Sequence, residues 1–336
     1  MFANYSYYFF WIAILFSCYS SAQTLSGYVF DEKTKEPLYG VSVYFDGTTN
    51  GTATDTQGKF IISYKASTES ALVISYLGYD SRAFDVRKLA SGVKVYLQPK
   101  NEALGVVYIE NDPWSRKKKM AIFRREFIGN SMEARDCKIL NEDDIDVVFN
   151  PTTKTLMAYA NKPILIKNKY LGYTVSYAME EFEATLQVSR NGFATTRRVY
   201  VEGTSFYSEL SEKTRKRYVK AREKEFGQSI LYFMRSLAKK QLEENGFQVF
   251  HKGFIVPPYK YFDITQEGEN TKVNLKTNKL TIMYDRFYKS FMTIPYENKE
   301  FYINKFGNFS PPKKLSFGGF FGEKRIANTL PLDYNL

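Results

Sequence analysis

Residues able to do acid–base, nucleophilic or metal chemistry are few in this sequence. His251 is the one histidine, which excludes zinc and iron sites built from several histidines and any serine or cysteine nucleophile activated by another histidine. The sequence has no Gly-x-Ser-x-Gly motif, no phosphate-binding glycine-rich loop and no His-Glu-x-x-His motif. We therefore predict a non-enzymatic protein with no catalytic residue, cofactor or metal, and a structural or surface role for His251.

Clustered carboxylates leave one alternative chemistry open. Glu180, Glu181 and Glu183 form a dense acidic group, and glycoside hydrolysis needs two carboxyl groups about 5–9 Å apart. Adjacent residues of a strand point to opposite faces of the sheet, which works against such a pair here. The alternative function is a hydrolase that acts on a glycan or a peptide through unassigned carboxylates of the C-terminal domain.

Neither calcium nor a disulfide is indicated. Asp31, Asp46 and Asp55 offer oxygen ligands on loops, but no loop carries the alternating carboxylates that a calcium site requires. If residues 1–22 are removed, Cys137 is the single cysteine left, and no intramolecular disulfide can form. Cys137 stands beside an apolar run, so we expect a small buried side chain rather than a nucleophile.

Two strongly basic segments are the candidates for contact with an anionic surface. Such runs suit anionic lipid headgroups, acidic glycans or an acidic partner, and the simpler alternative is a solvated basic face on a helix. Peripheral contact with a membrane is included in this expectation, whereas nucleic acid is not expected for an exported chain. The residues are Arg116, Lys117, Lys118 and Lys119 in the first segment and Arg215, Lys216 and Arg217 in the second.

The first 22 residues have the profile of a signal peptide. They contain no Asp, Glu, Lys or Arg, and an apolar run from Tyr8 to Phe16 precedes Ser20-Ser21-Ala22. The run is too short to span a bilayer, and the small residues suit cleavage before Gln23. We expect an exported protein of the periplasm, outer membrane or cell surface. The segment Leu15-Phe16-Ser17-Cys18 resembles a lipoprotein signal, so lipidation of Cys18 and its removal both stay open.

Length and charge indicate more than one folded unit. The chain has 336 residues, 44% of them hydrophobic, which is enough for two cores. Residues 23–109 hold nine basic and nine acidic residues, so the whole net charge of +11 lies in residues 110–336. We predict a mainly β protein with a β-sandwich at residues 23–100, a linker at 101–112 and an α+β domain at 113–336.

Short β-type runs separated by turn residues fill residues 26–97. Gly27–Phe30 and Val41–Phe45 alternate with the period of two that half-buried strands show. Asp55-Thr56-Gln57-Gly58 has the chemistry of a tight turn, because Asp bonds nearby backbone and Gly accepts a positive φ. Several strands at this spacing predict a sandwich.

Five ordered motifs in this segment resemble the carboxypeptidase-regulatory-like domain. The resemblance implies a transthyretin-like (prealbumin-like) sandwich of seven strands and a cell-envelope protein of the Bacteroidetes type. It brings no catalytic residue, because the peptidase that this domain accompanies elsewhere needs zinc ligands that this chain lacks. The motifs are Gly27-x-Val29-x-Asp31, Thr34-x-Glu36-Pro37-Leu38-x-Gly40-Val41-x-Val43, Gly51-Thr52-x-Thr54-Asp55-x-x-Gly58-x-Phe60, Ile74-Ser75-Tyr76-Leu77-Gly78-Tyr79 and Tyr96-Leu97-Gln98-Pro99.

The second unit is predicted to hold a small sheet with about three helices. Asp112-Pro113 indicates a first helix, whose apolar face carries Met120, Phe123 and Phe127. Ser211 indicates the cap of a second, basic helix, and Gly227–Glu244 indicates a third. Four segments of this unit are similar to uncharacterised Bacteroidetes proteins, a resemblance that implies no activity. They are residues 122–129, 170–173, 227–237 and 330–334.

Together these features predict a non-catalytic, secreted cell-envelope protein. Its β-sandwich and its basic, aromatic-rich second domain are expected to bind a protein or glycan partner. The sequence identifies neither that partner nor an oligomeric state.

Overall fold

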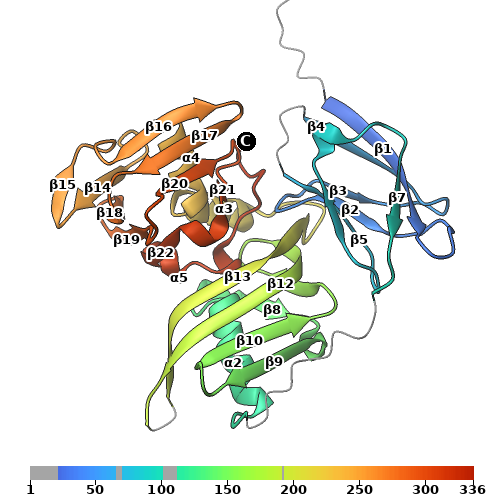
Figure 1. Cartoon of the computed structure of the whole chain (residues 1–336), viewed down its shortest axis with the longest axis horizontal. Coiled ribbons are helices and arrows are strands. Elements are labelled where there is room, and N and C mark those ends of the chain that lie inside the picture. The colour runs from blue at the N-terminus through green and yellow to red at the C-terminus, as the bar shows by residue number, and fades with distance from the viewer. Residues whose placement is uncertain (1–21, 66–69, 101–111, 191–192) are drawn as a thin grey trace, which may run out of the picture.

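The computed structural model describes residues 22–65, 70–100, 112–190 and 193–336. The predicted signal peptide lies outside the described residues except for Ala22, and so does the predicted linker except for Asp112. Figure 1 shows a sandwich lobe (residues 22–100), a middle lobe (112–227) and a third lobe (228–323). Among the described residues, no helix has the length and apolar character needed to cross a bilayer.

The sandwich lobe has the seven strands that the sequence predicted. One sheet has the strand order β4-β1-β7 and the other the order β3-β2-β5-β6. Strand β1 pairs antiparallel with β4 and parallel with β7. The elements are β1 (Ala22–Asp31), β2 (Ser42–Phe45), β3 (Gly51–Ala53), β4 (Lys59–Lys65), β5 (Leu72–Ser75), β6 (Arg82–Phe84), η1 (Val86–Lys88) and β7 (Val93–Leu97).

Alternation along β1 builds the core of this lobe. Leu25 and Val29 are fully buried and pack in one cluster with Phe60. The predicted turn before β4 is confirmed: the Asp55 carboxylate accepts hydrogen bonds from the backbone N–H groups of Gln57 and Lys59, both at 2.9 Å. Gly58 ends the turn with φ 73°, and a Cβ there would lie 2.5 Å from the carbonyl oxygen of Val29, so only glycine fits.

A long two-stranded ribbon, β12 and β13, is the spine of the middle lobe. The strands pair along most of their length, with irregularities at Met179/Glu181 and at Thr185/Leu186. Strands β11 and β10 share the other edge of β12, and β8 and β9 flank them. The elements are α2 (Arg116–Phe127), η2 (Glu133–Asp136), β8 (Cys137–Ile139), η3 (Glu142–Asp144), β9 (Ile145–Asn150), β10 (Thr155–Ala160), β11 (Ile164–Asn168), β12 (Tyr173–Val188), β13 (Ala194–Glu209) and α3 (Lys216–Gly227).

Helix α2 covers this sheet with the apolar face that its spacing predicted. Met120, Phe123 and Phe127 are buried. Phe123 packs edge-on against Phe182 of β12, with ring centroids 4.8 Å apart. These aromatic contacts fix the helix on the ribbon.

The start of α2 differs from the prediction because a nearer polar side chain caps the helix. The Ser115 hydroxyl accepts a hydrogen bond from the backbone N–H of Lys118. The Asp112 carboxylate instead accepts from the N–H groups of Trp114 and Phe149, at 3.0 and 3.1 Å. Asp112 therefore anchors the approach to the helix on β9.

The other two predicted helix starts also shift along the chain. Helix α3 begins at Lys216, and Ser211 does not cap it, because the Ser211 hydroxyl donates to the carbonyl of Lys213. Helix α4 begins at Ile230, where the Ser229 hydroxyl accepts from the N–H of Tyr232 at 2.9 Å. The predicted third helix is therefore shorter than residues 227–244 at both ends.

The third lobe packs two sheets and α4 around one core. The sheets have the strand orders β15-β14-β18-β19-β22 and β16-β17-β20-β21. The elements are α4 (Ile230–Ala238), β14 (Phe247–His251), β15 (Phe254–Val256), β16 (Phe262–Glu267), β17 (Asn270–Leu275), β18 (Lys279–Tyr284), β19 (Tyr288–Thr293), β20 (Glu300–Ile303), β21 (Phe309–Ser310), η4 (Pro312–Lys314), β22 (Ser316–Gly319), α5 (Phe320–Glu323) and η5 (Ile326–Asn328).

The second unit is thus more complex than the single small sheet with helices that we expected. Its described residues form three sheets and two hydrophobic cores. Pairings such as Phe247 with Tyr284 bring together strands that are distant in the sequence. Local patterns identify such strands and do not reveal which of them pair.

Residues 324–334, which we call the strap, tie the third lobe to the middle lobe. The Lys324 ammonium pairs with the fully buried carboxylate of Glu225 in α3 at 2.7 Å. The backbone N–H of Ala327 donates to the carbonyl of Ile128 at 3.1 Å, just after α2. Asn168 of β11 donates from its side-chain amide to the carbonyl of Ala327 at 3.1 Å.

The strap continues to the sandwich lobe. The N–H of Leu332 donates to the carbonyl of Gly47 at 2.6 Å. The Asp333 carboxylate accepts from the backbone N–H and the hydroxyl of Thr49, the latter at 2.7 Å. One segment therefore contacts all three lobes.

Arg235 of α4 holds the end of the strap. Its buried guanidinium donates to the carbonyl oxygens of Phe306, Leu332 and Tyr334 at 2.9, 2.7 and 2.9 Å. Burial lowers the pKa of Arg235 to about 10, which keeps the side chain charged at neutral pH. Its fork of donors satisfies carbonyls that would otherwise lack partners.

The loop between β2 and β3 docks the sandwich lobe on the ribbon. The N–H of Gly47 donates to the carbonyl of Ser205 at 2.7 Å, and the N–H of Tyr207 donates to the carbonyl of Thr48 at 3.0 Å. The Asp46 carboxylate accepts from the N–H of Ser205 at 2.7 Å. Side chains add to these bonds, because the Tyr44 ring packs on Phe206 of β13 with centroids 5.3 Å apart.

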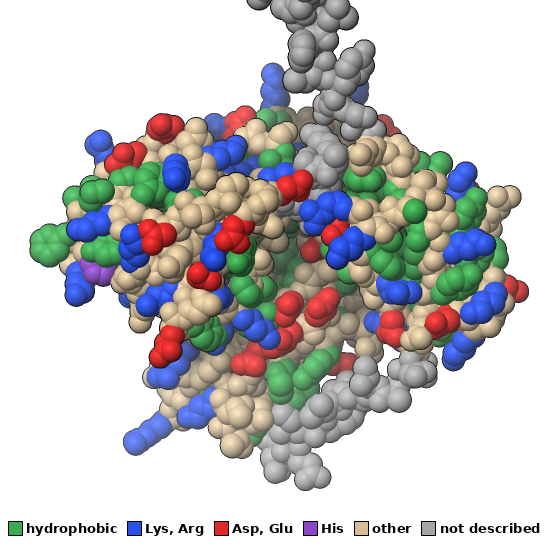
Figure 2. Space-filling model, turned by 45° about the horizontal axis from the view of Figure 1, so that its top comes forward, with side chains coloured by type: hydrophobic (Ala, Val, Ile, Leu, Met, Phe, Trp, Pro, Cys, Tyr) green, Lys and Arg blue, Asp and Glu red, His purple; other side chains and the backbone are tan. Residues whose placement is uncertain are grey.

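Figure 2 shows that the surface is hollowed where the three lobes meet, with acidic side chains gathered there. Arg87 of η1 lies 3.5 Å from Glu269, which follows β16, and links the sandwich lobe to the third lobe. Lys313 of η4 pairs with Glu181 of β12 at 2.9 Å and links the third lobe to the ribbon.

Candidate binding surface

The first basic segment lies on the first turn of α2, and the fold already uses several of its cations. The Arg116 guanidinium donates to the carbonyls of Ile145 and Glu142 at 2.8 and 2.9 Å. The Lys118 ammonium stands 3.8 Å from the centre of the Trp114 ring. The Lys119 ammonium pairs with the Asp112 carboxylate at 2.6 Å. The Lys117 side chain is exposed.

The second basic segment lies at the start of α3 and is more exposed. Arg215, Lys216 and Arg217 are all exposed, and the Arg217 guanidinium donates to the Tyr218 hydroxyl at 3.1 Å. The first segment contacts η3 and β9, whereas α3 packs against the start of β12 through Tyr218 and Gly172. The structure does not merge the two segments into one patch, and their contact with an anionic surface stays a prediction.

The acidic group on β12 lies at an irregularity of the ribbon. Glu180 falls in the register shift between Met179 and Glu181. Glu181 is paired with Lys313, whose ammonium also stands 4.4 Å from the centre of the Tyr200 ring. On β13 the Tyr200 hydroxyl donates to the Glu202 carboxylate at 2.6 Å. Burial is the main cause that raises the pKa of Tyr200, and this hydrogen bond is the second.

The three aspartates considered for calcium serve separate backbone contacts. Asp31 accepts from the N–H of Lys33 at 2.6 Å and from the Tyr79 hydroxyl at 2.6 Å. Asp46 docks the sandwich lobe and Asp55 shapes a turn, as described above. Among the described residues, no group of three or more His, Cys, Asp or Glu side chains could hold a metal ion.

The remaining reactive side chains are packed in the fold. Burial raises the pKa of the Cys137 thiol to about 12, so the thiolate nucleophile is not formed at neutral pH. The His251 ring packs on Tyr261 with centroids 4.4 Å apart. The Cys137 side chain is half-buried rather than buried, and the buried Nδ1 of His251 makes no hydrogen bond among the described residues. The structural roles predicted for both residues stay predictions.

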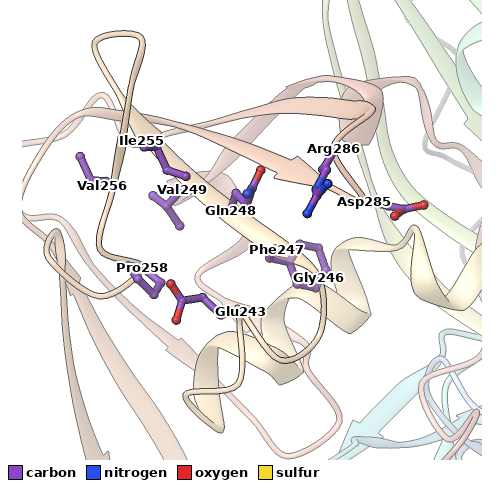
Figure 3. Close-up of a pocket in the computed structure, with 10 residues that line it drawn as sticks. All are labelled: Glu243, Gly246, Phe247, Gln248, Val249, Ile255, Val256, Pro258, Asp285 and Arg286. Atoms are coloured by element: carbon purple, nitrogen blue, oxygen red, sulfur yellow. The ribbon is translucent and has the colours of Figure 1, made fainter.

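A pocket of about 250 Å³ opens on the third lobe (Figure 3). Its apolar part comes from β14 and β15, and its polar side chains come from the turn after α4 and from the β18–β19 turn. Val249 is almost fully buried and forms part of the floor. The lining residues are Glu243, Gly246, Phe247, Gln248, Val249, Ile255, Val256, Pro258, Asp285 and Arg286.

Opposite charges stand at the margins of this pocket. Figure 3 shows the Glu243 carboxylate and the Arg286 guanidinium on different sides of the pocket, with Asp285 next to Arg286. Asp285 and Arg286 both have positive φ, 49° and 61°, in a turn without glycine. The size suits one side chain or one sugar unit rather than a larger ligand, for which pockets of roughly 300–1,000 Å³ are usual.

Sequence reasoning missed this pocket. Its residues come from three separated segments, and each segment alone looks like an ordinary turn or strand. The one local signal is Asp285-Arg286, a polar pair between two strand-like runs. Without a glycine or asparagine, that pair does not announce a tight turn with positive φ.

Comparison with known families identifies the N-terminal lobe. Residues 25–109 match the family model described as CarboxypepD_reg-like domain. The sandwich lobe is a carboxypeptidase-regulatory-like domain. The carboxypeptidase-regulatory-like domain is a non-catalytic, immunoglobulin-like fold, so it contributes no active site. No curated protein matches the chain, and the family match leaves residues 110–336 unassigned.

Proposed function

We propose that the chain is a non-enzymatic envelope protein that binds a protein or glycan partner, and that the third-lobe pocket takes one side chain or one sugar unit of it. The observation that carries this proposal is the pocket itself. Its lining combines the apolar side chains of Val249, Ile255 and Val256 with the charged side chains of Glu243, Asp285 and Arg286. Apolar contact supplies affinity, and the charged side chains orient the bound group.

Export is part of the same proposal. The charge-free, apolar first 22 residues favour secretion, followed by residence in the periplasm, the outer membrane or the cell surface. The carboxypeptidase-regulatory-like domain supports this placement only through the envelope context that the resemblance implies. Together they support a partner in the envelope.

The hydrolase alternative has less support. Glu181 is paired with Lys313, and the exposed Glu180 and Glu183 do not line the third-lobe pocket. A general acid or a nucleophile must lie beside the bound substrate. We therefore favour binding over hydrolysis.

Binding and turnover can be separated with purified protein. Residues 22–336, Glu243→Gln and Arg286→Gly would be incubated with the solubilised envelope fraction of the source cell, and both bound and chemically altered species would be identified by mass spectrometry. Lys154→Gly is the matched control, because Lys154 also has positive φ (57°) but lies in the β9–β10 turn of the middle lobe.

The proposal predicts one envelope species that the wild type and Lys154→Gly retain and that both pocket variants lose. It also predicts no altered species. Retention by the pocket variants would refute the assignment of the pocket, and turnover of an envelope glycan or peptide would refute the non-enzymatic function.

A further inference from the structure

The β14–β15 hairpin ends in an exposed apolar tip. Lys252 and Gly253 form its two-residue loop with φ 50° and 87°, the positive values that a tight antiparallel hairpin requires. Directly after the loop, the side chain of Phe254 is 77% exposed and that of Ile255 is 62% exposed. We call residues 251–255 the hairpin tip. Figure 1 shows β15 at the outer end of the third lobe, away from the sandwich lobe.

Basic side chains surround the hairpin tip. Phe250 pairs with Thr281, so the register places Lys279, the first residue of β18, at the same end of the sheet as Lys252. The Lys260 ammonium stands 5.7 Å from the centre of the Tyr261 ring, and that ring packs on His251.

One acidic side chain close in sequence to Lys260 is already paired. Asp263 lies 2.7 Å from the Lys276 ammonium. In Figure 2 a projecting hydrophobic side chain and several basic ones gather around the single histidine at the left end of the molecule. The hairpin tip is therefore both apolar and positively charged.

We propose that the hairpin tip binds the surface of an anionic lipid bilayer. Phe254 enters the boundary between headgroups and acyl chains, where aromatic side chains are favoured. Lys252, Lys260 and Lys279 remain at the level of the lipid phosphates, which attract them. The tip then anchors the third lobe peripherally.

The shape of the tip favours a bilayer over a protein partner. A stable protein interface buries about 800 Å² on each partner. A two-residue loop followed by two apolar side chains is convex and narrow and presents no face of that size. A fluid bilayer deforms around such a projection. The basic rim adds an attraction that neutral lipids cannot supply.

Vesicle sedimentation tests this proposal. The protein used would be residues 22–336, which leaves out the apolar segment 1–21. It would be mixed, at low and at high salt, with vesicles of phosphatidylcholine alone and with vesicles that also contain phosphatidylglycerol. The test variants are Phe254→Ser and Lys252→Glu, since Ile255 also lines the pocket and is left unchanged. The matched controls are Phe287→Ser and Lys94→Glu. Phe287 is 83% exposed but lies beyond Tyr284, which pairs with Phe247 at the opposite end of β14.

The proposal predicts that the wild type binds anionic vesicles and that salt weakens this binding. Each test variant should bind about tenfold more weakly, which corresponds to RT ln 10 in binding free energy. The controls keep wild-type binding. In Phe254→Trp, tryptophan emission shifts to shorter wavelength when anionic vesicles are added, and in Phe287→Trp it does not.

Two results would overturn the proposal. One is equal vesicle binding by the wild type, the tip variants and the controls. The other is the absence of vesicle binding by the wild type; a soluble protein that Phe254→Ser releases would then make the tip a protein contact. Either result leaves the pocket and its partner untouched, because Phe254 and Lys252 do not line the pocket.

Discussion

Asp46 is a carboxylate held between the sandwich lobe and the ribbon, and its environment makes it sensitive to pH. Burial raises the pKa of Asp46 to about 6, despite the hydrogen bond from the N–H of Ser205. Nearby Glu180 on the ribbon adds repulsion in the same direction. Because this pKa lies above the value of an exposed Asp, the folded chain binds the proton more tightly than the unfolded chain.

The free energy of unfolding should therefore rise as the pH falls from 7 to 5. Asp46 should contribute about 1 kcal/mol over that interval. Asp46→Asn should remove this contribution, because the amide carries no charge and its oxygen still accepts from Ser205. Denaturant unfolding of both proteins at pH 5, 6 and 7 measures the effect. Parallel pH profiles for the two proteins would contradict this account.

Arg286 is a pocket residue whose conformation lowers the stability of the fold. A non-glycine residue with φ 61° is strained by about 1 kcal/mol, and glycine is not. Arg286→Gly should therefore raise the free energy of unfolding by about that amount while it weakens binding at the pocket. Lys154→Gly, strained alike but outside the pocket, should raise stability without changing binding. Unfolding curves together with the envelope capture distinguish these outcomes, and an Arg286→Gly protein that keeps its partner would disprove the role of the arginine.

At the scale of elements, a serine side chain caps the start of α2 and of α4, whereas α3 begins without a side-chain cap. Ser229 caps α4, and Ser211 does not cap α3. Ser229→Ala should lower the free energy of unfolding by about 1 kcal/mol, because the N–H of Tyr232 loses its acceptor. Ser211→Ala should change it by less than about 0.5 kcal/mol. Thermal or denaturant unfolding of the two variants is a direct comparison, and equal losses would show that the cap has been misassigned.

The sandwich was predictable because its signals are local. Asp55 and Gly58 define a turn within four residues, and the alternation of β1 gives its buried face without knowledge of the partner strand. The helix starts were less certain, because Asp112, Ser115 and Ser211 are all chemically able to cap. Which of them does so depends on tertiary contacts, such as that of Asp112 with the N–H of Phe149.

The third lobe and its pocket were beyond sequence reasoning for a different cause. Its sheets depend on which of many similar strands pair, and the pocket exists only after Glu243, Ile255 and Arg286 have been brought together. The basic segments were recognisable as runs of charge, but the contacts that their side chains make within the fold were not. The Arg116 guanidinium, for example, donates hydrogen bonds to two backbone carbonyls.

At the scale of the whole molecule, the strap explains why several distant sequence segments belong together. Residues 122–129 supply the carbonyl of Ile128, residues 227–237 supply Arg235, and both contact the strap. The strap in turn reaches Gly47 and Thr49 of the sandwich lobe. The lobes are therefore joined by backbone bonds and buried ions more than by a shared apolar core.

Arg235→Lys should weaken this connection strongly. A lysine ammonium cannot reach the carbonyls of Phe306, Leu332 and Tyr334 together in the geometry of the guanidinium fork. Leaving buried carbonyls without donors should lower the free energy of unfolding by on the order of 3 kcal/mol. Limited proteolysis should then cut at the strap first. Arg215→Lys, at an exposed position, is the control, and equal protease resistance of the two variants would contradict the role of Arg235.

The most direct test of the central claim, that this chain binds an envelope partner through the third-lobe pocket, is photo-cross-linking in the native cell. A photoreactive amino acid would replace Gln248 inside the pocket or, as the control, exposed Lys94 on the sandwich lobe. The account predicts one discrete adduct with an envelope protein or glycan from position 248 and none of that size from position 94. No adduct at position 248, or the same adduct from both positions, would contradict it.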